Sequence, residues 1–287
     1  MIKQLENYLQ QRCTEYVGQA EERACGKMAL KKALWKKRGA ELMNVKARGR
    51  ILSTKQEEGE TKVTYNIHWR YFLKQRDLFY MEEEIEKRCA RFGENELLSN
   101  EEVAETKVIE EIPALVYEGE PTRAPFYYDR LKAVQYANLW WNGTNPKYRR
   151  FNDDCTNFIS QCLHAGGAPM HGAPNRSAGW WYGGGTWSYS WTVAHALQLY
   201  LKNSKGGLNT REVETVDELQ LGDIICYDFE GDGRFNHNTI ITAVDIYDVP
   251  LVNAHTTDSR HRFWSYEDST AYTPNIQYRF YAIVDDA

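Results

Sequence analysis

The sequence has no long run of apolar residues, and no stretch approaches the roughly 20 residues needed to cross a bilayer. Its first residues, 1–7, also lack the basic start and the apolar core of a secretory signal. As it stands, the sequence therefore predicts a cytoplasmic protein without a membrane span. Export by another route remains open.

An excess of positive charge is also missing. The chain carries 35 Lys and Arg against 40 Asp and Glu, a formal net charge of −5, which disfavours a dedicated nucleic-acid binder. Residues 27–50 are the exception, with nine basic residues against one Glu. We interpret this run as a solvated helix face, with a patch for nucleic acid or an anionic membrane as the alternative.

Cysteine pairs and metal-binding patterns are absent as well. The six cysteines form no CxxC pair, which excludes a zinc ribbon and a tight disulfide framework, so we expect free thiols in a reducing compartment. The histidines show no HExxH motif and no other metal-ligand spacing. We therefore expect neither a metal nor a cofactor.

Composition divides the 287 residues into two parts. Only two of the nine tryptophans lie in residues 1–120, and a proline-rich stretch at residues 110–125 opposes regular structure. This predicts an α+β accessory domain over residues 1–112, a linker over 113–125 and a second domain over 126–287.

The first domain shows no catalytic constellation. Apolar spacing predicts a long helix over residues 2–37, with Gly18 and Gly26 as weak points. Residues 63–71 alternate between apolar and polar side chains, as a half-buried strand does. Residues 76–92 fit either a paired strand or a short helix, because their run of glutamates makes the pattern ambiguous.

The second domain contains a candidate nucleophile. Asp154 in front and two glycines behind bracket a helix of about three turns, with Cys155 in its first turn. The free amides and the dipole of a helix start favour a thiolate there. The alternative is core packing, because Cys155 and Cys162 share an apolar stripe. Cys162 lies mid-helix and is interpreted as a core residue.

A base and an orienting group follow on later strands. His237 begins an apolar strand, and residues 252–256 form the next strand, where a polar side chain could bind the far nitrogen of His237. Cysteine, histidine and a polar residue in this order match the logic of nucleophile, base and orienter.

These motifs resemble the bacterial putative amidase domain, which is grouped with the papain-like NlpC and CHAP cysteine peptidases. The resemblance rests on residues 154–161, on residues 221–224 and on the Gly-Asp-Gly-x-x-x-His segment ending at His237. It implies Cys155 as the nucleophile, His237 as the base and His255 as the third member, with Asn253 as the rival. It also implies cleavage of amide bonds, often in cell-wall peptides.

The sequence thus predicts an α+β chain, with a papain-like cysteine amidase or peptidase domain following the smaller α+β domain. A non-catalytic protein that binds a peptide or glycan, and an acyltransferase, are the alternatives. Both use the same scaffold.

Two further segments allow two interpretations each. Asp154 and the aromatic loop with Trp180, Trp181 and Trp187 could bind substrate, although the rings could equally pack the edge of the sheet. The acidic segment from Asp228 to Asp232 resembles a calcium loop. It lacks the closing Glu, which favours a hairpin turn.

Overall fold

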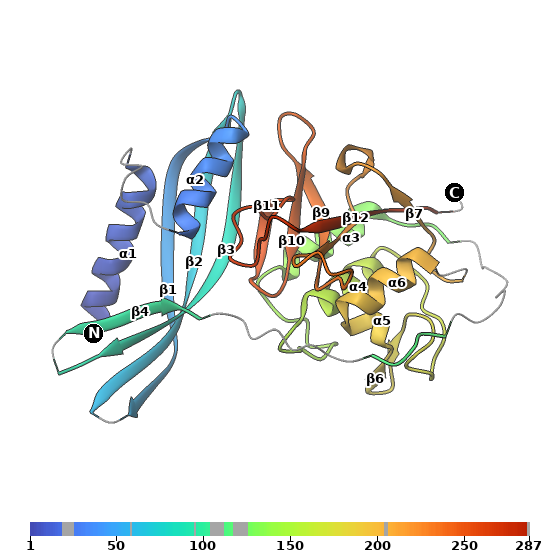
Figure 1. Cartoon of the computed structure of the whole chain (residues 1–287), viewed down its shortest axis with the longest axis horizontal. Helices are drawn as coiled ribbons and strands as arrows, with labels where there is room; N and C mark the ends of the chain where they lie inside the picture. Colours follow the sequence, from blue (N-terminus) through green and yellow to red (C-terminus); the bar gives the residue numbers. More distant parts are fainter. Residues whose placement is uncertain are drawn as a thin grey trace. The chain divides into compact units, whose positions relative to one another are not determined.

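Two helices and four strands form the N-terminal part of the chain in a computed structural model, which describes residues 1–18, 26–57, 59–94, 96–103, 112–116, 126–203 and 206–285 (Figure 1). The helices are α1 (Ile2–Val17) and α2 (Lys27–Lys37), and the strands are β1 (Glu41–Glu57), β2 (Glu60–Gln75), β3 (Leu78–Phe92) and β4 (Leu97–Glu102). All pair antiparallel, in the order β1-β2-β3, with β4 on β3.

The predicted single helix over residues 2–37 is two helices. α1 ends before Gly18, whose backbone is extended, and α2 follows Gly26, which has a positive φ of 62°. These are the two glycines that the sequence marks as weak points, and a left-handed backbone at the second ends any helix. Residues 19–25 lie outside the described part of the chain.

The ambiguous segment 76–92 is a strand, β3, and its glutamates explain the ambiguity. Glu82, Glu84 and Glu86 alternate onto the face that α1 and α2 cover, where they are buried. Each accepts a hydrogen bond from an aromatic side chain, and the donors are Trp35 Nε1 at 2.9 Å, Tyr71 Oη at 2.8 Å and Trp69 Nε1 at 2.8 Å, respectively. The predicted strand 63–71 lies within β2, and its apolar residues face this interior.

The C-terminal part is a second antiparallel sheet region with helices on one face. Its strand order is β11-β10-β9-β8-β12-β7. The strands are β7 (Thr210–Val213), β8 (Ile224–Asp228), β9 (His237–Val244), β10 (Pro250–Ala254), β11 (Ser259–Phe263) and β12 (Gln277–Ile283), with a small pair β5 (Tyr182–Gly183) and β6 (Thr186–Trp187). The helices are α3 (Arg130–Trp140), α4 (Cys155–Ala165), α5 (Tyr189–Thr192) and α6 (Ala194–Asn203), with a 3-10 turn at Val216–Glu218.

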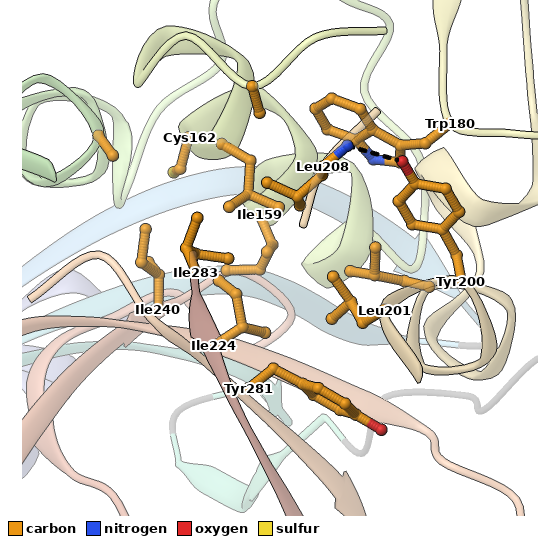
Figure 2. Packing of buried hydrophobic residues seen from close by; sticks show 14 of the residues in the cluster. Ile159, Cys162, Trp180, Tyr200, Leu201, Leu208, Ile224, Ile240, Tyr281 and Ile283 are labelled. Carbon is orange, nitrogen blue, oxygen red and sulfur yellow. Dashed lines mark hydrogen bonds between the residues drawn. The ribbon is translucent and has the colours of Figure 1, made fainter. Parts of the chain in front are cut away.

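Side chains from α4, α6 and the three strands β8, β9 and β12 contribute to one buried core in this part (Figure 2). Ile159 and Cys162 of α4 meet Ile224, Ile240 and Tyr281 of the sheet. The sequence prediction that Cys162 is a core residue is confirmed, since its side chain is fully buried. The chain is therefore α+β, with a large antiparallel sheet and few helices.

The contacts divide the chain into two units. The first comprises Met1–Thr106 together with the later segments Thr257–Ser259 and Tyr266–Thr270, and the second comprises the remainder. The domain limits 1–112 and 126–287 stay predictions, and residues 117–125 of the predicted linker lie outside the described part. No helix among the described residues is both long and apolar enough to cross a membrane.

Candidate active site around Cys155

Helix α4 begins at Cys155, as the sequence predicts, with Asp154 at the preceding cap position. The Cys155 side chain is only 2% exposed. Its sulfur lies 3.6 Å from Asp153 Oδ1 and 3.6 Å from Thr156 Oγ1, and it accepts a hydrogen bond from the backbone N–H of Asn238. The first residues of β9 therefore reach the sulfur.

The electrostatics of this position differ from the prediction. Burial raises the pKa of the Cys155 thiol well above its ordinary value, and the negative charge of Asp153 raises the pKa further. The net effect differs from the prediction of a lowered thiol pKa, because desolvation and the neighbouring carboxylate outweigh the groups that favour a thiolate. The resting group is a thiol.

Replacing Asp153 by asparagine should therefore speed alkylation of Cys155 by iodoacetamide. Removal of the negative charge lowers the thiol pKa, so a larger fraction of Cys155 is thiolate at a given pH. Peptide mapping of alkylation rates at pH 8 measures this, with Asp217→Asn at an exposed position as control. An unchanged or slower rate in the Asp153 variant would contradict the electrostatic account.

His255 is bound to the residue that precedes the cysteine. Its Nδ1 lies 2.7 Å from Asp154 Oδ2, its Nε2 lies 2.8 Å from the Trp140 carbonyl oxygen, and its ring stacks on Phe158 at 4.0 Å. Both ring nitrogens of His255 are therefore engaged, one with a carboxylate and one with a backbone carbonyl.

Asp154 does not cap its helix with its side chain. Besides His255, its carboxylate accepts hydrogen bonds from the Phe151 N–H and the Asn157 amide, each at 2.9 Å. The predicted role of Asp154 in substrate binding is therefore not supported, because the side chain is buried and its oxygens are occupied. The carboxylate instead fixes the loop in front of the helix.

Thr256 is a site residue that the sequence analysis missed. Its hydroxyl accepts from the Asp154 N–H and donates to Asp153 Oδ1, both at 3.0 Å. Its φ is 59°, in the left-handed region, which is uncommon for a β-branched residue. No local sequence signal marks it, since its role depends on the fold bringing residue 256 to residues 153 and 154.

His237 begins β9, as predicted, but its ring lies on the opposite face from α4. Its neighbour Asn238 donates to Thr156 Oγ1 of α4 at 3.0 Å. The His237 ring instead lies 5.6 Å from the Tyr227 ring and 6.1 Å from that of Phe229, centroid to centroid. The structure thus brings the backbone beside His237 to the sulfur, but does not turn the ring toward it.

The environment of His237 keeps its ring neutral. Burial lowers the pKa of His237 from 6.5 to about 3, and the positive charge of Arg262 lowers it as well. At neutral pH, the buried imidazole is therefore unprotonated, and a pKa this low makes it a weak proton acceptor in this position.

Asn253, the rival third member, is engaged elsewhere. Its Oδ1 accepts from Thr242 Oγ1 at 2.7 Å and from the His261 N–H at 2.9 Å, and its Nδ2 donates to Asn138 of α3 at 3.1 Å. These bonds hold β10 against α3. Neither Asn253 nor His255 is placed to orient the His237 ring as it stands.

Comparison with known proteins shows the family of this chain. A family model described as "Putative amidase domain" matches residues 127–281. The chain belongs to the putative amidase domain family. It is 52% identical over 269 residues to "Uncharacterized protein YhbB" of Bacillus subtilis (strain 168), covering 90% of this chain and 86% of that protein. It is also 30% identical over 125 residues to "Uncharacterized protein YjcM" of the same organism, covering 40% and 28%. No solved structure matches.

The aromatic loop of this putative amidase domain is largely interior. Trp180 and Trp181 are 0% and 3% exposed, so their rings pack in the interior, and their predicted contact with substrate stays a prediction. Trp180 Nε1 donates to Ser160 Oγ, and Trp191 Nε1 donates to Asn157 Oδ1, both at 3.0 Å on α4. Trp180 lies within the core (Figure 2).

Trp187 differs from these tryptophans because it is only partly buried. Its ring packs edge-on against Phe151 with centroids 4.9 Å apart, and the guanidinium groups of Arg149 and Arg176 lie 5.4 and 5.6 Å from its centroid. Its predicted contact with substrate stays a prediction.

The acidic turn of the putative amidase domain is held by its own backbone. The buried Asp228 carboxylate accepts hydrogen bonds from the N–H groups of Gly231, Asp232 and Gly233. This is the hairpin turn that the sequence favours over a calcium loop. Among the described residues, no group of three or more His, Cys, Asp or Glu side chains could hold a metal ion.

Proposed function

We propose that the C-terminal unit is a papain-like, cysteine-dependent hydrolase of amide or peptide bonds, with Cys155 as its nucleophile. The observation that carries the proposal is the position of Cys155 at the first residue of α4, with its sulfur against the N–H of Asn238. Membership of the putative amidase domain family supports the same reaction class.

In the proposed reaction, the Cys155 sulfur attacks the carbonyl carbon of the amide and the amine leaves, forming a thioester. Water then attacks the thioester and releases the acid and the free thiol. Because burial and Asp153 raise the pKa of Cys155, its proton must leave during the attack. The backbone N–H of Cys155 is a candidate donor to the oxyanion.

We assign the proton transfers to His237. The peptide group that follows it already binds the sulfur, and turning the ring out of its buried position removes the desolvation that lowers its pKa to about 3. Transfer requires the side chain to turn, at the first residue of β9, from the Tyr227 face toward Cys155. His255 then acts as a positioning residue that holds Asp154, and through it the loop before the nucleophile.

The substrate proposal follows the resemblance to wall-acting enzymes: a peptide amide, including the stem peptides of cell walls. The test is a panel of muropeptides, short peptides and simple amides, assayed with the intact chain. Turnover should vanish in Cys155→Ala and fall at least a thousandfold in His237→Asn, a typical range for loss of a catalytic group. His255→Asn should retain measurable turnover.

Other outcomes would replace parts of the proposal. Full activity in Cys155→Ala would remove the nucleophile. If His255→Asn loses turnover while His237→Asn keeps it, His255 rather than His237 is the base. Equal binding of one substrate class by the intact chain and Cys155→Ala, without turnover by either, would favour the binding protein. Amide exchange onto an added amine, in place of hydrolysis, would indicate an acyltransferase.

A further inference from the structure

The basic run at residues 27–50 divides into two halves with different surroundings. On α2, cations are neutralised within the N-terminal unit. Lys27 pairs with Glu102 at 3.1 Å, Lys31 pairs with Asp268 at 2.7 Å, and Arg38 pairs with Glu82 at 2.8 Å. These three cations contribute to the interior of the unit rather than to a binding surface.

The second half lies on the sheet face opposite the helices. Lys46, Arg48 and Arg50 alternate along β1, opposite Arg70, His68 and Asn66 of β2. Asn66 in turn faces Lys87 of β3. We call the five cations on these three strands the basic face; they are Lys46, Arg48, Arg50, Arg70 and Lys87, and all five are exposed.

Carboxylates do little to offset this charge. Glu83 points to the same face, but its carboxylate binds His68 at 2.8 Å and is buried. Within the described ranges, no ion pair involves any of the five cations. The acidic residues of β1 and β2 on this face stand at the strand ends, at Glu41, Glu57 and Glu60.

The shape of the basic face selects a linear ligand. Successive cations on β1 are two residues, or about 6.8 Å, apart along an extended strand. Toward the far end of the strands, Lys62 and Arg91 line a hollow of about 440 Å³ that continues the positive charge, although Glu101 also lines it. Long strands twist, as β1, β2 and β3 do in Figure 1. A flexible polymer can follow that twist, whereas a flat bilayer cannot.

The side chains between the cations select a backbone rather than bases. The middle of the face presents Asn66, His68, Thr64 and Ile85, without a Trp, Tyr or Phe on which a base would stack. The aromatic rings of this face, Phe72 and Phe79, lie toward one end of the strands, where they stack on each other. Three of the five cations are arginines, whose planar fork matches phosphate oxygens. We infer that the basic face binds a flexible, linear phosphodiester polyanion through its backbone. This inference does not depend on the proposed hydrolase.

The probe is a fluorescent abasic phosphodiester oligomer of about 12 units, titrated with the intact chain and followed by anisotropy. For about five phosphate contacts, the slope of log K against log salt is about −3.5, so affinity should fall roughly a hundredfold between 50 and 200 mM salt. The triple variant Lys46→Glu/Arg48→Glu/Arg50→Glu should weaken binding at least about tenfold at 50 mM salt.

The matched control reverses three exposed charges elsewhere, in Lys3→Glu/Lys147→Glu/Lys202→Glu, and should bind within about twofold of the intact chain. Equal weakening by both triple variants, or no binding of the oligomer, would overturn the inference. It would also be overturned by tenfold tighter binding of an oligothymidine of equal length, or by preferential binding of anionic vesicles. Cys155→Ala should bind like the intact chain, which keeps this test separate from that of the hydrolase.

Discussion

Replacing Lys31 by methionine is expected to lower the free energy of unfolding of the N-terminal unit by about 3–5 kcal/mol. The Lys31 ammonium group lies 2.7 Å from Asp268 and 3.6 Å from Glu84, and all three side chains are at most 3% exposed. Methionine fills the same space but removes the ammonium group from the buried Asp268 and Glu84 carboxylates, of which Glu84 keeps Lys27 at 3.5 Å. Urea unfolding followed by circular dichroism measures the difference.

Lys37 provides the matched control on the same helix. It pairs with Glu267, in the same later segment of the unit, but the two side chains are 67% and 34% exposed. Lys37→Met should therefore cost at most about 1 kcal/mol. Adding Asp268→Asn to Lys31→Met should recover part of the loss. Equal effects of the two single variants would show that the buried pair contributes no more than an exposed one.

Acid should destabilise the C-terminal unit through His237. Its pKa is 6.5 when exposed and about 3 when folded, so the unfolded state binds more protons between these values. Stability then rises with pH across this window and is fully present above pH 6.5. Between pH 7 and pH 4, the loss attributable to this residue is about 3 kcal/mol.

His237→Gln should remove this part of the pH dependence, because glutamine does not titrate. The measurement is the free energy of unfolding from urea titrations at pH 7, 6, 5 and 4. The control is His164→Gln, at an exposed side chain of α4, which should keep the loss on acidification. If His237→Gln loses stability between pH 7 and pH 4 as steeply as the intact chain, the buried neutral ring is not its cause.

Local patterns in the sequence predicted the elements whose signals are local. The alternation at 63–71 identified β2, and the Asp154 and double-glycine brackets located α4. The run of glutamates left the assignment of residues 76–92 open between strand and helix, because a buried Glu is uncommon unless paired. Its partners, such as Trp35 and Trp69, come from other elements. Only the tertiary structure brings these donors to the acids.

In the candidate site, too, some features follow from neighbouring residues and others depend on the tertiary structure. The position of Cys155 at a helix start and of His237 at a strand start followed from neighbouring residues. Which face of β9 carries the His237 ring depends on how the strand meets α4, and the thiol pKa depends on burial, so neither could be predicted. The His255–Asp154 bond spans about a hundred residues of chain and has no local signature.

The two indole groups bound to α4 allow changes at this helix to be followed by tryptophan fluorescence. Trp191 and Trp180 each donate to a side chain of the helix that carries Cys155, at Asn157 and Ser160. Indole emission depends on the hydrogen bonding and polarity around the ring. Any event that shifts the start of α4, including occupation of the site, will therefore change the intrinsic fluorescence of these buried tryptophans. The protein carries its own spectroscopic probe of the nucleophile's helix, and no label is needed.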